Sequence, residues 1–556
     1  MRLLFVLLAS LTATATARAA DAVADLLRLA PKDTTVALVV RDLRGHAGRL
    51  LDSPFAKWFP DSQLGKALFA SKDWNTLATV EKFVAAQLGA SGRDLLDGVL
   101  GDGVVFAYRN RDDSSLILLR AGKPELLATV LDRLNAAQKE SGEITAIREK
   151  KHGEATYTER ERSDGRHEFY WASGGTLAFS QTEASVREAI DRAATPGPAP
   201  LVDALEKLKL TTAVVTAVFH PRALDGDLAA ALAGAKDASQ KAFLTQFQRL
   251  WTACDAVAVS VEVGRTLDVA LNVAVNPKLV PDDLRPILAP GIPSALWSAI
   301  PTDALFATAG TLDLPKLLAA LRSFLSDDGK AGLTLLLNDH VGPVVGKRQL
   351  PSLLAGVGPD VALWVTAPPA GAAGWTPVGT VALKVGDGAE VGPLLVSALD
   401  AVAQVVRIEY NRTHDDQLDL KTARNPDGDV KSLVNDAYFP PGVRPAFGVR
   451  HGHLIVSTSD AAVTAFARPG AAPASANGLI ARASLARLRG YLTAREKDII
   501  PAVAAMTGTK PAELRQQFGH FRDVLELFES VELRRAGTGE VVRLMLSVTP
   551  ARPLAK

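Results

Sequence analysis

"LAFSQTEASVREAI" (residues 177–190) runs from an apolar strand through a serine into a helix, and "LIVSTSDAAVTAFA" (residues 454–467) repeats the pattern. Ser180 and Ser457 each stand at the strand-to-helix joint, with an acidic residue three positions later. This spacing fits the capping box, in which the hydroxyl accepts from a first-turn amide and the acid reaches back. A nucleophile elbow would need G-x-S-x-G, which neither copy has. We therefore predict that Ser180 and Ser457 are helix N-caps and not nucleophiles.

The two copies belong to a longer repeat, and such self-similarity indicates a duplicated architecture. Five segments recur in the same order: 31–37 as 301–307, 95–106 as 353–364, 177–190 as 454–467, 215–224 as 479–488, and 247–276 as 521–550. In the second of these segments, Phe106 aligns with Trp364. The order of the matches predicts a tandem duplication of one unit.

Each copy reads as helices alternating with hairpins and meanders, without the steady strand–helix–strand rhythm of a parallel sheet. We therefore predict an α+β fold with mostly antiparallel sheets packed against helices. In the first copy we expect a three-stranded meander broken at His152-Gly153, Asp164-Gly165 and Gly174-Gly175. Proline- and glycine-rich seams predict these parts: a signal peptide at 1–20, front domains at 21–195 and 294–470, and back subdomains at 198–290 and 475–556.

The first residues predict export. Arg2, the apolar run "LLFVLLASL" and Ala17-Arg18-Ala19 form the charged, apolar and cleavage regions of a secretory signal peptide. No later stretch has the about 20 consecutive apolar residues of a spanning helix. We expect a soluble periplasmic or extracellular protein without a transmembrane segment in the mature chain.

Charge and cysteine content exclude several classes of protein. The formal net charge is +1, and it becomes −1 without Arg2 and Arg18, so the chain lacks the basic character of a nucleic-acid-binding protein. Cys254 is the single cysteine and lies in the alternating segment "CDAVAVSVEV". An internal disulfide is therefore excluded, and we expect Cys254 to be a buried small apolar residue in a strand.

Metal ligation is the strongest alternative chemistry in the sequence. His451 and His453 would lie on one face of a strand, and His414 and Asp415 in the preceding hairpin are candidate further ligands. An exposed turn is the better interpretation of the two histidines, and the metal site is kept as the alternative. The sequence holds no P-loop, no H-E-x-x-H and no C-x-x-C, and no G-x-G-x-x-G in a strand-to-helix setting. We expect no cofactor and assign no catalytic residue.

The signal peptide, the "LAPKDTTVA" opening, the strand followed by "DL" and a helix, and the closing strand–serine–helix motif resemble a family of exported bacterial proteins. That family is grouped as a large domain of unknown function. The resemblance covers most of the mature chain. It implies export and a duplicated α+β scaffold, and it carries over no catalytic residue.

The sequence favours a non-enzymatic envelope or extracellular protein whose two halves form a scaffold or a binding surface. Its partner would be an unknown protein or small molecule, and the oligomeric state is open. Two alternatives remain. One is a hydrolase or metal-dependent enzyme with a site between the repeats, and the other is a carrier of an apolar ligand between sheet and helices.

Overall fold

The computed structural model describes residues 17–210, 212–282, 285, 292–345, 350–369, 371–372, 374–386 and 391–554. The chain divides into two compact units. Unit 1 comprises Met1–Ala230, Trp251–Leu279 and Thr538–Lys556, and unit 2 comprises Ala231–Leu250 and Val280–Gly537. Each unit therefore includes a segment from the other half of the sequence, so the halves do not separate at a single point.

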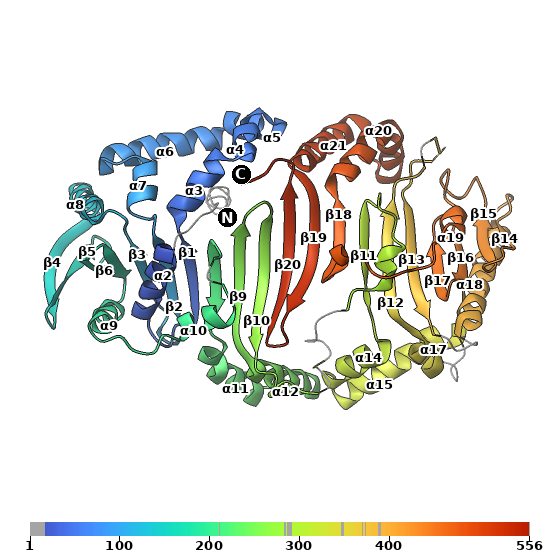
Figure 1. Cartoon of the computed structure of the whole chain (residues 1–556), viewed down its shortest axis with the longest axis horizontal. Coiled ribbons are helices and arrows are strands. Elements are labelled where there is room, and N and C mark those ends of the chain that lie inside the picture. The colour runs from blue at the N-terminus through green and yellow to red at the C-terminus, as the bar shows by residue number, and fades with distance from the viewer. Residues whose placement is uncertain are drawn as a thin grey trace. The chain divides into compact units, whose positions relative to one another are not determined.

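Unit 1 is an antiparallel sheet with helices (Figure 1). Its strands are β1 (Val36–Arg41), β2 (Gly103–Arg109), β3 (Ser114–Arg120), β4 (Ile144–His152), β5 (Ala155–Arg162), β6 (His167–Ser173), β7 (Thr176–Ser180), β8 (Val215–Phe219), β9 (Cys254–Val263), β10 (Leu267–Val275) and β20 (Val541–Pro550). They pair antiparallel in the order β4-β5-β6-β7-β3-β2-β1-β8-β9-β10-β20.

Unit 1 has these principal helices: α2 (Ala17–Leu29), α3 (Leu43–Asp52), α4 (Pro54–Trp58), α5 (Gln63–Ala70), α6 (Lys72–Leu88), α7 (Gly92–Gly98), α8 (Pro124–Glu140), α9 (Glu183–Ala194) and α10 (Pro200–Lys207). One face of the sheet packs against α2, α9 and α10. This core is built from Val23, Leu26 and Leu27 of α2 and from small strand residues such as Ala37 and Ala107. Helix α11 (Asp225–Ala233) follows β8.

Unit 2 repeats this strand order. Its strands are β11 (Phe306–Thr311), β12 (Val357–Thr366), β13 (Val378–Val385), β14 (Asp419–Ala423), β15 (Val430–Val434), β16 (Ala446–Arg450), β17 (His453–Ser457), β18 (Leu479–Ser484) and β19 (Phe528–Gly537). They pair antiparallel as β14-β15-β16-β17-β13-β12-β11-β18-β19. Strand for strand, this is the order β4 to β9 of unit 1.

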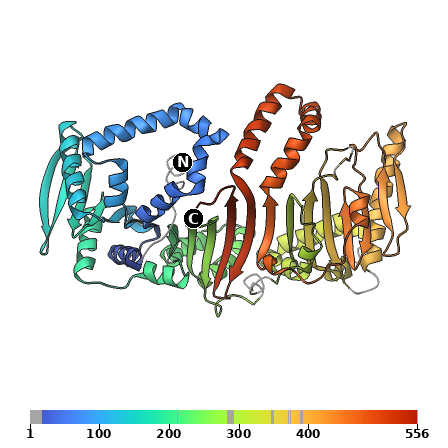
Figure 2. The same ribbon diagram turned by 45° about the horizontal axis from the view of Figure 1, so that its top comes forward.

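The helices of unit 2 include α12 (Ala238–Ala253), α14 (Leu314–Ser323), α15 (Asp327–Leu336), α16 (Gly342–Val345), α17 (Leu350–Gly356), α18 (Val391–Thr413), α19 (Asp460–Thr464), α20 (Leu485–Thr507) and α21 (Pro511–Glu526). Helices α20 and α21 form a helical hairpin (Figure 2). Helix α12 contacts the loop after α14, where the rings of Phe243 and Phe324 lie 5.9 Å apart.

These elements confirm the predicted α+β fold with antiparallel sheets. The shared strand order is what a tandem duplication would produce, and the duplication itself stays a prediction. The meander of unit 1 has four strands, β4 to β7, and not the predicted three, because the three glycine-containing turns separate four segments. The predicted boundaries between front and back parts lie between strands of the same sheet, since β1 pairs with both β2 and β8.

One aligned pair is wrong by a single residue. Ala37 pairs with Ala107 in unit 1, and its counterpart Ala307 pairs with Trp364 in unit 2. Trp364 therefore takes the place of Ala107, and Phe106 is on the opposite face. Exposure agrees, because Trp364 is 5% exposed and Phe106 is 38% exposed. A slip of one residue turns every side chain of a strand to the other face.

The structure describes only the end of the predicted signal peptide. Ala17, where α2 begins, is the first described residue, so the Ala17-Arg18-Ala19 cleavage signal lies in the first turn of α2. The rest of that prediction lies outside the described residues. Within them, α18 alone is long and apolar enough to cross a membrane, by length and composition only. The sequence analysis overlooked α18, because its apolar residues are interrupted by Asp400, Gln404 and Arg407.

Candidate functional site

The most distinctive surface of unit 1 is the face of its sheet opposite α2, α9 and α10. Side chains that lie directly opposite each other on paired strands share a face. The strand register therefore defines a row of apolar residues across eight strands, which we call the open row: Phe179, Ile117, Phe106, Leu38, Ala217, Val259, Leu271 and Leu544. At about 4.8 Å between strands, this row is about 34 Å long.

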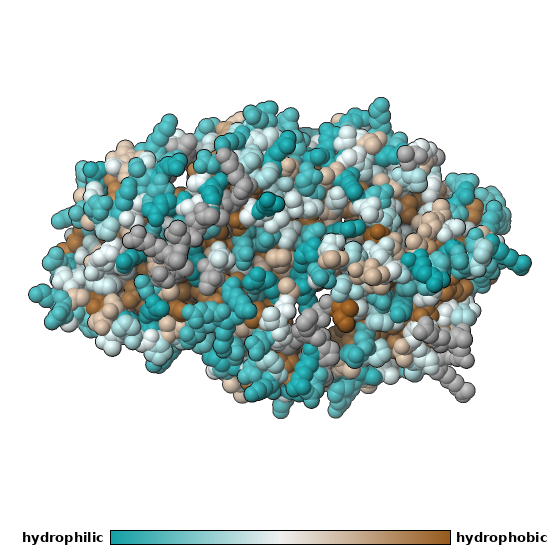
Figure 3. Space-filling model, viewed as in Figure 1, coloured by the Kyte–Doolittle hydropathy of each residue, from teal (hydrophilic) through white to brown (hydrophobic). Residues whose placement is uncertain are grey.

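The open row is accessible to solvent in the described structure. Six of its eight side chains expose between 36 and 44% of their surface: Leu38, Phe106, Ile117, Val259, Leu271 and Leu544. Single exposed apolar residues are ordinary, but contiguous ones mark interaction surfaces. On the side of the molecule in Figure 3, too, hydrophobic side chains lie in patches among hydrophilic ones.

The rows beside the open row are also uncharged. On one side are Leu177, Leu119, Val104, Val40, Val215, Val261, Val269 and Leu546. On the other side are Ser115, Tyr108, Val36, Phe219, Val257, Val273 and Val542. Across these three rows the polar side chains are Ser115 and Tyr108, and no side chain is charged at neutral pH. Such a surface favours an apolar ligand over a charged one.

Part of this face is covered. Leu43 and Leu50 of α3 pack against Val40, Val215 and Val261 in the first flanking row. Val99 after α7 and Leu127 of α8 pack in the same way against Leu119 and Leu177. These helices cover the flanking row from β7 to β9, leave Val269 and Leu546 of that row exposed, and leave the open row accessible beside it.

The distribution of side-chain size supports a binding role. The helix-covered face carries small residues, among them Ala37, Ala107 and Ala258, all at most 3% exposed. The open row carries larger residues such as Leu38 and Phe106 at neighbouring positions of the same strands. Large apolar side chains gain most free energy from burial, about 1.5–3 kcal/mol each. The larger side chains therefore face the side where the described chain gives them incomplete cover.

Unit 2 has a smaller version of this face. The corresponding row is Val456, Val381, Leu363, Thr308, Ala481 and Leu533. Leu363 and Val456 are 38% and 37% exposed, as is Phe306 of the adjacent row at 38%. Thr308 stands where unit 1 has Leu38, so this row is shorter and less apolar.

The sequence analysis missed the open row, although the strands carried a signal for it. Segments such as "VALVV" (36–40), "VVFAY" (104–108) and "SLILL" (115–119) are apolar at nearly every position instead of alternating with polar residues. Such strands are typical of sheets whose two faces are both removed from water. The sequence alone does not say which face the helices of the chain cover.

The predicted helix caps are corrected. Helix α9 begins at Glu183 with Thr182 as its N-cap, and α19 begins at Asp460 with Ser459 as its N-cap. Ser180 and Ser457 are instead the last residues of β7 and β17. Two residues separate each serine from the first residue of the helix, so the hydroxyl lies too early in the chain to cap the first turn.

The two serines nevertheless perform the same local task. The Ser180 hydroxyl donates to the carbonyl of Ser115 at 2.6 Å and accepts from the amide of Thr182 at 2.9 Å. The Ser457 hydroxyl donates to the carbonyl of Gly379 at 2.9 Å and accepts from the amide of Ser459 at 3.2 Å. Both side chains are buried, so each hydroxyl fixes the chain as it leaves the sheet.

The proposed metal ligands do not form a metal site. His451 has φ +50° in a left-handed turn, and β17 begins only at His453, so the two imidazoles do not share a strand face. His453 is buried, and its Nδ1 lies 2.8 Å from the His451 carbonyl oxygen. His414 stacks on Tyr410 at 4.0 Å, next to Asp415. Among the described residues, no three His, Cys, Asp or Glu side chains form a group that could hold a metal ion.

A buried polar cluster lies where β1 meets α3. Asp42 has φ +42° and caps α3 by accepting from the Gly45 amide at 3.1 Å. Burial raises the pKa of Asp42 and lowers that of Arg41. His46 is 4% exposed, and burial, together with the charge of Arg49, lowers its pKa to about 4. The cluster keeps His46 neutral at physiological pH and belongs to the packing of α3 against the sheet.

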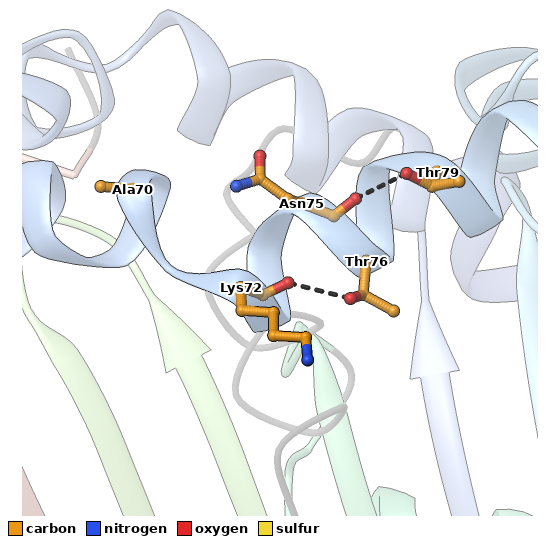
Figure 4. A pocket seen from close by; sticks show the side chains of 5 residues that line it. All are labelled: Ala70, Lys72, Asn75, Thr76 and Thr79. Atoms are coloured by element: carbon orange, nitrogen blue, oxygen red, sulfur yellow. Dashed lines mark hydrogen bonds between the residues drawn. The ribbon is translucent and has the colours of Figure 1, made fainter.

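Two further features carry little chemistry. Cys254 lies in β9, as predicted, but its side chain is only partly buried. That partial burial raises the pKa of its thiol, which disfavours the reactive thiolate. A hollow at the junction of α5 and α6 is lined by Ala70, Lys72, Asn75, Thr76 and Thr79 (Figure 4). The hydroxyls of its two threonines donate to carbonyl groups of their own helix.

No family model matches this chain, and no match was found among curated proteins or solved structures. The resemblance to exported bacterial proteins of unknown function therefore stays a prediction.

Proposed function

We propose that this chain is an exported binding protein whose ligand is an apolar molecule with a long hydrocarbon chain. The observation that carries the proposal is the open row, with its uncharged neighbours on both sides. An exported protein meets lipids at the cell envelope, and the predicted export would place this one there. Of the functions that the sequence left open, this proposal joins the binding protein with the apolar ligand carrier.

The dimensions of the face support a chain-like ligand. The open row extends for about 34 Å, whereas the hydrocarbon of one lipid leaflet is about 15 Å thick. An extended acyl chain would therefore fit along the row within unit 1. Contact with six half-exposed apolar side chains would bury apolar surface of both the ligand and the protein. This burial would stabilise the complex by roughly 25 cal/mol for each Å² of apolar surface removed from water.

The test is to measure what unit 1 binds. Purified protein is extracted with organic solvent for mass spectrometry, and the extracted protein is titrated with a fluorescent fatty acid. We expect a bound lipid and saturable probe binding. Leu271→Gln places an amide in the open row and should weaken probe binding by roughly tenfold, about 1.4 kcal/mol.

Leu51→Gln is the matched control. Leu51 is a 56% exposed leucine of α3 in the same unit but is not part of the face. It should leave probe binding unchanged. Equal probe affinity in the two variants, or a protein that neither carries lipid nor binds the probe, would overturn the proposal.

A further inference from the structure

Helix α18 of unit 2 exposes an apolar stripe. Val402, Val405, Val406 and Ile408 are 45%, 66%, 41% and 60% exposed, at the three- and four-residue spacing of one helix face. In the most apolar stretch of this helix, only 22% of the residues are buried. A core helix of this composition would be mostly buried, so α18 lacks a cover on this side within the described residues.

The N-terminal half of α18 is fixed to unit 2, so the exposed stripe belongs to its C-terminal half. Val391 and Ala398 are buried with Leu353, Val385 and Leu454. Asp400 also forms an ion pair with Lys431 of β15 at 2.7 Å. Crossing a membrane would break these contacts, so the geometry favours a helix that lies on a surface over one that spans a bilayer.

Tyrosines stand at the end of the stripe. Tyr410 belongs to the last turns of α18, and its ring lies 4.6 Å from that of Tyr438, which is 53% exposed. The Tyr410 hydroxyl donates to Asp416 at 2.8 Å. Tyrosine is enriched at membrane–water interfaces because its ring is apolar and its hydroxyl is polar.

The area of the stripe distinguishes between two partners that could cover it, a second copy of the chain and a lipid bilayer. Its four side chains expose about half of roughly 100 Å² each, on the order of 200 Å² in total. A stable dimer needs about 800 Å² from each partner, so the stripe is too small to hold a second copy. A lipid bilayer sets no such minimum, because each inserted apolar side chain adds to the binding on its own.

We propose that the stripe of α18, with Tyr438, inserts into the surface of a phospholipid bilayer while the helix axis lies in the membrane plane. Charge contributes little, because Glu409 and Arg412, which continue the same helix face toward its C-terminal end, pair with each other at 2.6 Å. Binding should therefore occur on uncharged phosphatidylcholine vesicles and change little with salt. This surface is separate from the open row, and the proposal does not depend on the proposed ligand.

The test is flotation of the full chain with phosphatidylcholine vesicles. Wild type should float with the vesicles, and Val405→Gln/Ile408→Gln should reduce the bound fraction by roughly tenfold or more. The matched control is Leu335→Gln/Leu336→Gln, which changes two leucines of α15 that are 65% and 55% exposed. This control should float like the wild type.

Three outcomes would overturn the proposal: no flotation of the wild type, equal flotation of both double variants, or a concentration-dependent dimer that Val405→Gln/Ile408→Gln abolishes. Probe binding by Val405→Gln/Ile408→Gln in solution should equal that of the wild type. That measurement separates a failure of the membrane surface from a failure of the proposed ligand site.

Discussion

Helices α8 and α18 occupy the same place in the two units, but the exposed surface of α8 is charged and that of α18 is apolar. Each connects the strand at the centre of its sheet to the outer meander, β3 to β4 in unit 1 and β13 to β14 in unit 2. The segments "LLATVLD" (126–132) and "LLVSALD" (394–400) align without a gap, so the sheet-facing residues are similar. Beyond them, Arg133 and Glu140 of α8 correspond to Ala401 and Ile408 of α18.

The surroundings of the two helices explain part of this difference. In unit 1, α6 packs against α8, and the rest of α8 faces water with charged residues. In unit 2, α18 contacts the short helices α16 and α17, and its exposed side is apolar. The comparison teaches that the strand order constrains one side of each helix and leaves the other side free to take a separate role. Substitutions at equivalent positions of the two units therefore test which residues stabilise the shared fold.

The largest expected effect concerns a pair of facing core residues in which the large and the small side chain have swapped strands between the two units. Leu118 pairs with Ala178 in unit 1, whereas Ala382 pairs with Ile455 at the same place in unit 2, and all four are at most 1% exposed. Leu118→Ala would leave two alanines and a cavity, at a cost of about 2–5 kcal/mol. We expect faster hydrogen exchange in peptides from β3 and β7.

The double variant Leu118→Ala/Ala178→Ile copies the arrangement of unit 2. If the units are equivalent, it should recover at least half of the protection that Leu118→Ala loses. A double variant that exchanges as fast as Leu118→Ala would show that the two sheets pack differently at this position, despite their shared strand order.

The second prediction concerns pH and the helix that follows β1 in unit 1 and β11 in unit 2. His46 of α3 is buried, whereas Leu317 at the corresponding place in α14 is 39% exposed. The folded chain binds a proton at His46 only near pH 4, but the unfolded chain binds it near pH 6.5. Unfolding therefore takes up a proton between these values, so stability falls as pH drops from about 6.5 to about 4, by about 3 kcal/mol in total.

Urea unfolding of the wild type and of His46→Gln at pH 7 and pH 4.5 measures this dependence. The glutamine variant should lose less stability on acidification than the wild type. Asp42, whose pKa is raised by burial, titrates with the opposite sign and is present in both proteins, so it cancels in the comparison. Parallel pH dependences in the two proteins would contradict the assigned cause.

The third prediction compares the serines at the ends of β7 and β17. Ser180→Ala removes the acceptor of the Thr182 amide and the donor to the Ser115 carbonyl, and buried groups left without partners cost about 1–3 kcal/mol. Ser457→Ala should cost a similar amount in unit 2. Hydrogen exchange of the Thr182 and Ser459 amides is the measurement. A loss of protection in only one unit would contradict a shared role.

The sequence predicted the three glycine-containing turns of the unit 1 meander, because such turns are local signals, but it gave the meander three strands where the structure has four. It did not predict the covered face of each sheet, since strands such as "VALVV" are apolar on both sides and only the helices distinguish them. The exchange of residues 231–250 and 538–556 between the units was also missed, because contacts such as the pairing of β10 with β20 join residues about 270 positions apart.

The same distinction between local and long-range signals applies to the candidate site residues. Ser180 and Ser457 were correctly placed at strand-to-helix joints, but their role was wrong because the start of each helix depends on two intervening residues. For His451 and His453 the favoured interpretation was an exposed turn, which agrees with the left-handed turn at His451, although His453 itself is buried at the start of β17. The open row and the α18 stripe could be recognised only in the structure. The sequence shows that these strands and this helix are apolar, but it does not show which of their side chains the rest of the chain leaves uncovered.

The smallest expected effect tests the corrected helix caps. The Ser459 hydroxyl accepts from the Ala462 amide at 3.4 Å, whereas Thr182 makes no side-chain capping bond. Ser459→Ala should therefore destabilise α19 by about 0.5–2 kcal/mol, and at the low end of that range because the bond is long. Thr182→Ala should change the stability of α9 by less than about 0.5 kcal/mol. Hydrogen exchange of the first-turn amides measures both, and an effect of Thr182→Ala as large as that of Ser459→Ala would show that the two joints are capped alike.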